Sequence, residues 1–135
     1  MPLPKKANGA NFKVSGGELT VQFDAGGPAV VHVVCIWGPK PAFGGQRPKL
    51  WCSETEKSSK DGATVTVPEG MAVAGSQVTW SGGLIAKRGE QGRLLVTVAE
   101  QGGESESFSY EYQFTKRNQT ESFYDGLNFT SRESA

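Results

Sequence analysis

Apolar and polar residues alternate with a period of two along much of the chain. Residues 19–23 place Leu19, Val21 and Phe23 on one side, with polar residues between them. Because successive side chains of a strand point to opposite faces, this period predicts half-buried β-strands. Similar alternation, or a short apolar run of strand length, recurs at 49–52, 63–67, 76–80, 84–87, 93–99 and 105–115.

Residues 29–37 form the most apolar stretch, Ala-Val-Val-His-Val-Val-Cys-Ile-Trp. It is rich in β-branched residues and apolar on both faces, which predicts a central strand covered on both sides. The core predicted from all these strands consists of Leu19, Val21, Phe23, Val31, Val33, Cys35, Val65, Val67, Val78, Trp80, Leu94, Val96, Val98, Phe108, Tyr110, Tyr112 and Phe114.

Pairs of glycines separate several predicted strands, and no segment has the period of a helix. Glycine supplies the positive φ that tight turns need. About eight short strands separated by turns predict an all-β protein, an antiparallel β-sandwich of immunoglobulin-like or jelly-roll-like type, with a small β-barrel as the alternative. We expect the sandwich over residues 15–115, an extended N-terminal arm over 1–14 and a polar C-terminal segment over 116–135.

Composition narrows the classes of function. The length of 135 residues suits one domain, and the 14 basic and 14 acidic side chains give a net charge of zero. Nucleic-acid binding relies on many cationic contacts to phosphates, so no nucleic-acid partner is expected. No apolar run reaches the roughly 18 residues of a membrane span. The N-terminus lacks the apolar region of a signal peptide, so an intracellular or virion-associated location is expected.

Few residues are available for metal or nucleophilic chemistry. His32 is the only histidine, and the three aspartates are scattered along the chain. A zinc site needs three or four suitable ligands, so neither a metal ion nor an organic cofactor is expected. His32 and Cys35 are an odd number of residues apart on one strand, so they face opposite ways and form no catalytic pair. We therefore interpret His32 as a packed strand residue.

Three glutamates are the strongest candidates for carboxylate catalysis. Glu104 and Glu106 share one face of a predicted strand, and Glu111 lies further along it. A catalytic acid needs burial to raise its pKa, whereas the first two residues flank an exposed glycine turn. We interpret all three as solvated charges that protect a sheet edge. No catalytic residue is assigned, the protein is predicted not to be an enzyme, and a histidine-independent hydrolase is the least favoured alternative.

Cys35 and Cys52 allow two interpretations. They can form a disulfide that closes a short loop, or remain free thiols. The lack of a signal peptide favours free thiols, because disulfides persist mainly in oxidising compartments. The sequence leaves the pairing open.

The loop of residues 38–48 is the candidate binding segment. Three prolines exclude a central strand there, and aromatic residues flanked by cations are typical of binding surfaces. The sequence on its own favours a lid-like Phe43 folded onto the core over an exposed Phe43. The candidate binding residues are Trp37, Lys40, Phe43, Arg47, Lys49 and Trp51.

Together these features predict a non-catalytic interaction or structural module, a subunit of a larger assembly such as a virion or a tail. Its partners would be other proteins or copies of itself in a homo-oligomer. A sandwich-type lectin, whose aromatic residues stack on glycans, is the alternative. Both chain ends carry apolar anchors that either dock on a neighbour or close the chain's own sandwich. These anchors are Phe12, Val14, Phe123, Tyr124, Leu127 and Phe129. In the docking interpretation, deleting residues 1–10 weakens assembly and leaves the fold intact.

Overall fold

The computed structural model describes residues 6–25, 29–58, 62–86, 89, 91–115 and 119–131, and in these ranges the chain forms strands and no helix. The all-β prediction is thus confirmed. No helix in the described ranges is long and apolar enough to cross a membrane. The described strands are β1 (Ala10–Val14), β2 (Leu19–Asp24), β3 (Ala29–Trp37), β4 (Lys49–Cys52), β5 (Glu56–Ser58), β6 (Ala63–Val67), β7 (Gln77–Ala86), β8 (Gln91–Glu100), β9 (Ser105–Gln113) and β10 (Gln119–Ser131).

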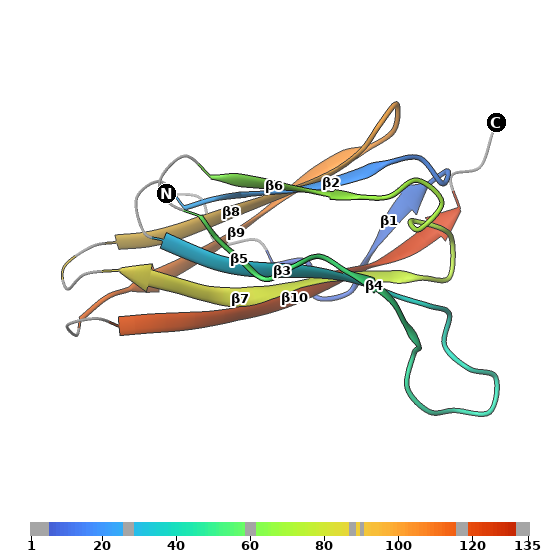
Figure 1. The fold of residues 1–135 in the computed structure, drawn as a ribbon, viewed down its shortest axis with the longest axis horizontal. Helices are drawn as coiled ribbons and strands as arrows, with labels where there is room; N and C mark the ends of the chain where they lie inside the picture. The colour runs from blue at the N-terminus through green and yellow to red at the C-terminus, as the bar shows by residue number, and fades with distance from the viewer. Residues whose placement is uncertain are drawn as a thin grey trace.

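The strands form two sheets that pack face to face (Figure 1). The larger sheet has the order β1-β10-β7-β3-β4, with β5 also paired to β3, and the smaller has the order β6-β2-β8-β9. Neighbouring strands are antiparallel except β1 and β10, which are parallel. Because the described strands close into no barrel, the sandwich prediction is confirmed and the barrel alternative is wrong.

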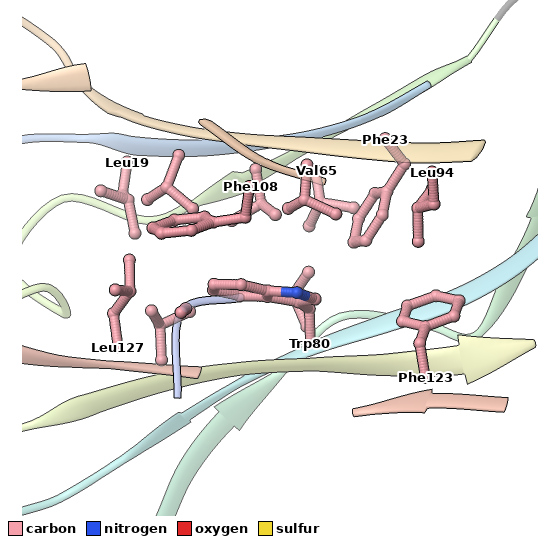
Figure 2. Packing of buried hydrophobic residues seen from close by; sticks show 14 of the residues in the cluster. Leu19, Phe23, Val65, Trp80, Leu94, Phe108, Phe123 and Leu127 are labelled. Atoms are coloured by element: carbon pink, nitrogen blue, oxygen red, sulfur yellow. The ribbon is translucent and has the colours of Figure 1, made fainter. Parts of the chain in front are cut away.

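The core lies between the two sheets. Figure 2 shows Phe23, Leu94 and Phe108 of one sheet facing Trp80 and Phe123 of the other. The Trp80 and Phe108 rings stack with their centroids 5.7 Å apart. The alternation of apolar and polar residues identified most of this layer. The predicted core residues that are buried are Leu19, Val21, Phe23, Val65, Val67, Val78, Trp80, Leu94, Val96, Val98, Phe108, Tyr110 and Phe114.

On β3 the prediction chose the wrong face. Val31, Val33 and Cys35 are only half-buried and point away from the core. The buried side chains are those of Val30, His32, Val34 and Ile36. Both faces of this strand are apolar, so its own sequence pattern does not indicate which face is buried. The register with β7 decides it, since Val34 and Ile36 lie opposite the inward-facing Trp80 and Val78. Tyr112, also predicted in the core, is half-buried and packs against it.

Both chain ends contribute strands to the larger sheet. Parallel β1 and the long β10 pair with each other, so residues 10–14 and 119–131 extend the sandwich beyond the predicted 15–115. Tyr124 alone among the predicted anchors is exposed, at 71%. The other anchors, Phe12, Val14, Phe123, Leu127 and Phe129, are buried in the chain's own core. Of the two interpretations of these anchors, closure of the chain's own sandwich is therefore the one observed.

A buried polar network holds the segment before β1. The Trp80 indole N–H donates to the Tyr110 hydroxyl, which donates to the Asp125 carboxylate. The backbone N–H groups of Ala7 and Asn8 donate to the same carboxylate at 2.7 and 2.6 Å. Burial, followed by the hydrogen bond to Asp125, raises the pKa of Tyr110 above its ordinary value. The network gives a buried carboxylate the donors that it needs.

An Asn-Gly turn aims these N–H groups at Asp125. Asn8 and Gly9 both have positive φ, 48° and 73°, and the N–H of Ala10 donates to the carbonyl of Ala7 at 2.9 Å. Two consecutive residues with positive φ are typical of a type I′ turn, for which Asn-Gly is the preferred pair. The turn thus fixes the segment against β10.

Candidate functional site

The loop of residues 38–48 joins β3 to β4 and projects from one end of the sandwich (Figure 1). At its base the N–H of Gly38 donates to the carbonyl of Pro48 at 2.7 Å. A β-carbon on Gly38 would lie 2.8 Å from Cγ of Pro48, closer than real contacts allow. A glycine is needed here because the two sides of the loop approach so closely.

Arg47 fastens this base to the rest of the molecule. Its Nη1 atom donates to the carbonyl of Gly38 at 3.0 Å and to the carbonyl of Gly75 at 2.8 Å. Gly75 lies in the connection between β6 and β7, which the N–H of Gly75 in turn ties to β10 through Phe129. Arg47, predicted as a binding residue, therefore has a positioning role.

A disulfide lies beside the loop. Cys35 of β3 and Cys52 of β4 are opposite each other, and their Cα atoms are 4.0 Å apart. The preference for free thiols is thus wrong. That preference came from the compartment expected for the chain, whereas the pairing follows from a strand register that the sequence did not specify. The bond joins neighbouring strands of one sheet and limits how far the two sides of the loop can separate.

Phe43 occupies the exposed tip of the loop. The relative solvent exposure of Phe43 is 103%, so no other part of the chain packs over its side chain. The N–H of Gly44 donates to the carbonyl of Pro41 at 3.3 Å, which closes a turn containing Phe43. The lid interpretation, in which Phe43 folds onto the core, is therefore wrong.

The two tryptophans that flank the loop lie on opposite faces of the larger sheet. Trp37 is on the outer face, where its indole N–H donates to the Thr79 hydroxyl at 2.9 Å. Lys49 lies over the Trp37 ring, with Nζ 5.3 Å from the centroid, as in a cation–π contact. Trp51 is opposite Ile36 and packs against the core. The six predicted binding residues therefore do not form one cluster.

The loop is cationic. Lys40 and Arg47 are its ionisable residues, Lys49 follows at the start of β4, and there is no acidic residue from Gly38 to Cys52. Lys40 and Lys49 are exposed, and Leu50 adds a second exposed apolar side chain, at 48%, near the base. The loop and the start of β4 thus combine an exposed aromatic side chain with positive charge.

The other candidates for chemistry lie far from catalytic geometry. His32 is buried and stacks on Phe23 with ring centroids 4.6 Å apart. Glu104 and Glu111 are exposed and Glu106 is half-buried, all on the edge strand β9 or beside it. Within the described ranges, no three His, Cys, Asp or Glu side chains are grouped closely enough to hold a metal ion.

The buried carboxylate of Glu100, like that of Asp125, was not predicted from the sequence. It is buried at the end of β8 and accepts hydrogen bonds from the N–H groups of Ser15 and Gly17. These bonds fix the connection between β1 and β2, which crosses from one sheet to the other. Its position directly before a glycine turn resembles that of a solvated charge, so the sequence carried no signal of its burial.

Comparison with protein-family models, with curated proteins and with solved structures finds no match for this chain.

Proposed function

We propose that the protein is a non-catalytic interaction module, a subunit of a larger assembly such as a virion or a tail, and that it binds its neighbour through the loop of residues 38–48. The observation that carries this proposal is the full exposure of Phe43 at the tip of a fastened loop. Aromatic side chains that fill pockets contribute much of the energy of protein interfaces. The fastened base supports the proposal further, because a loop that is already ordered loses less entropy on binding.

The residues of the loop indicate which surface its partner would present. Burying a phenylalanine side chain contributes about 2 kcal/mol, so the partner would offer an apolar pocket. Lys40 and Lys49 would meet acidic residues around that pocket, which raises the rate of association at low salt. A second copy of the chain carries such residues, because Glu104 and Glu111 are exposed at the β9 edge. A contact between this loop and that edge would be head-to-tail and would build an extended or ring-shaped assembly.

Light scattering after size-exclusion chromatography tests this proposal. We expect the full chain to associate as its concentration rises, and Phe43→Ser to raise the dissociation constant about thirtyfold, the equivalent of about 2 kcal/mol. Leu95→Ser is the matched control, because Leu95 is a large apolar side chain exposed on the other sheet. Phe43→Ser should leave the melting temperature unchanged, since the side chain of Phe43 is fully exposed.

Charge reversal tests the head-to-tail contact. Lys40→Glu with Lys49→Glu should abolish association, and Glu104→Lys with Glu111→Lys should restore it when the two double variants are mixed. A full chain that stays monomeric at every concentration, with no co-purifying protein, contradicts the proposal. So does a Phe43→Ser variant that associates as the unaltered chain does.

A further inference from the structure

A second candidate site lies on the outer face of the larger sheet, away from the loop tip. Strands β3, β7 and β10 alternate, so one set of their side chains points away from the other sheet. The pairing places Trp37, Gln77 and Asn128 in one row across this face and Val33, Ser81 and Tyr124 in another. The row between them contains Thr79 and Gly126.

This middle row forms the floor of a pocket of about 210 Å³. Gln77 lines one end, Tyr124 the other, and the turn at Asn8 and Gly9 forms a side wall. Gly126 contributes no side chain to the floor, and a β-carbon there would lie 2.6 Å from the carbonyl oxygen of Val78. Only glycine fits this close approach of β10 to β7, and its lack of a side chain leaves the space open.

The polar groups around the pocket are held in place by hydrogen bonds. The Gln77 amide donates to the Asn128 side-chain oxygen at 3.3 Å, and the Asn128 amide donates to the carbonyl of Gly9 at 2.8 Å. The Thr79 hydroxyl accepts the indole N–H of Trp37, so its own hydrogen is available to donate. Amides and a hydroxyl of this kind both donate and accept, as sugar hydroxyls do.

The lining of the pocket includes no basic residue and a single acidic one. Asp125 is the one acidic residue of its lining, and its carboxylate is buried and accepts hydrogen bonds from Ala7, Asn8, Gly126 and Tyr110. These donors satisfy the hydrogen-bond acceptors of the carboxylate within the chain. The chemistry of the lining therefore suits a neutral ligand with several hydroxyl groups.

Tyr124 supplies a stacking surface. The residue is 71% exposed beside this lining. The ring of Trp37, on the same face of the sheet, has Lys49 lying over it. The face of an aromatic ring is electron-rich and attracts the slightly positive C–H groups along one face of a pyranose. Beside the ring of Tyr124 the lining offers the amide of Gln77 and the hydroxyl of Thr79, which pair with hydroxyl groups of a ligand.

From these observations we propose that the pocket binds one neutral pyranose ring of a glycan, stacked on Tyr124 and hydrogen-bonded by Gln77, Thr79 and the turn at Asn8. The site is separate from the loop of residues 38–48. Glycan binding and assembly through Phe43 are accordingly independent properties of the chain.

An array of neutral and anionic glycans, followed by NMR titration of the labelled full chain, tests the proposal. The titration uses the methyl glycosides of glucose, galactose, mannose and N-acetylglucosamine. We expect binding of a neutral glycan and shifts of the backbone amides of Gly9, Gln77 and Gly126. Tyr124→Ala should weaken binding at least tenfold, whereas Tyr124→Phe, which keeps the ring, should retain it.

Two further variants separate this site from the loop. Leu95→Ala, on the opposite sheet, and Phe43→Ser should both bind the glycan as the unaltered chain does. Tyr124→Ala should associate normally in light scattering. Binding of anionic glycans only, absence of any neutral glycan bound on the array and in the titration, or equal binding by Tyr124→Ala would each overturn the proposal.

Discussion

His32 shows how one residue links packing to pH. Its ring is fully buried against Phe23, and within the described chain both ring nitrogens lack a hydrogen-bond partner. Gly82 lies opposite it on β7, where a β-carbon would collide with the carbonyl oxygen of Val31. Burial lowers the pKa of His32, and the negative charge of Glu56 on the neighbouring β5 opposes this shift only in part. The neutral imidazole is therefore the form that the fold accepts.

This lowered pKa predicts a loss of stability in mild acid. Below about pH 6.5 the unfolded chain binds a proton at His32 before the folded chain does, so the free energy of unfolding falls as the pH decreases. Urea unfolding at pH 7.5 and pH 5.5 measures this change. His32→Leu removes two unpaired buried nitrogens, so we expect it to unfold no more easily at pH 7.5 and to lose less stability at pH 5.5. An equal loss in both proteins would contradict this explanation.

The strands differ in how far sequence alone could predict them. On β2, alternation identified both the strand and its buried face, because Leu19, Val21 and Phe23 are separated by polar residues. On β3, apolar residues occupy both faces, and the one polar side chain, His32, points inward. The pairing with β7 sets that direction, and such long-range register is invisible in a local pattern.

The last strand, β10, was missed for a related reason. Phe123, Leu127 and Phe129 alternate correctly, but the inward position between the first two is occupied by Asp125. A charged residue at a core position normally argues against burial. Here two of the donors to Asp125, the N–H groups of Ala7 and Asn8, lie more than a hundred positions earlier, which no local pattern reveals.

The candidate site was predicted only in part for the same reason. The composition of the loop of residues 38–48 pointed to a binding segment, but it could not tell an exposed Phe43 from a lid. Tyr124 was predicted as an anchor rather than as part of a pocket. That pocket depends on two strands and a turn meeting in space, so its residues are scattered along the chain.

The β3–β4 hairpin depends on its disulfide. The bond between Cys35 and Cys52 closes a loop with a sequence separation of 17 residues. A loop of this size restricts the unfolded chain enough to contribute about 3 kcal/mol. We expect reduction by dithiothreitol to lower the free energy of unfolding by that amount, measured by urea unfolding.

The double variant Cys35→Ala with Cys52→Ala is the control for this prediction. It should match the reduced protein in stability and be insensitive to dithiothreitol. A reduced protein as stable as the oxidised one would show that the bond does not limit the unfolded chain.

In the molecule as a whole, the two sheets are tied together by segments that cross between them. Glu100 of the smaller sheet receives hydrogen bonds from the connection between β1 and β2. Tyr110 of the same sheet reaches across the core to Asp125 of the larger one. Because Asp125 also holds Ala7 and Asn8, the N-terminal segment completes a network that spans the sandwich.

Deleting residues 1–9 should therefore destabilise the fold, in contrast to the docking interpretation of the chain ends, in which deleting residues 1–10 leaves the fold intact. The deletion removes two N–H donors from a buried carboxylate, which should cost roughly 2 kcal/mol or more in the free energy of unfolding. If the charge of Asp125 is the cause, the same deletion should cost less in an Asp125→Asn background, where the buried group is neutral. Urea unfolding of the four proteins in this double-mutant cycle gives the coupling directly. Equal costs in both backgrounds would refute the role of Asp125. An unchanged melting temperature together with a loss of association would restore the interpretation of the N-terminus as an assembly arm.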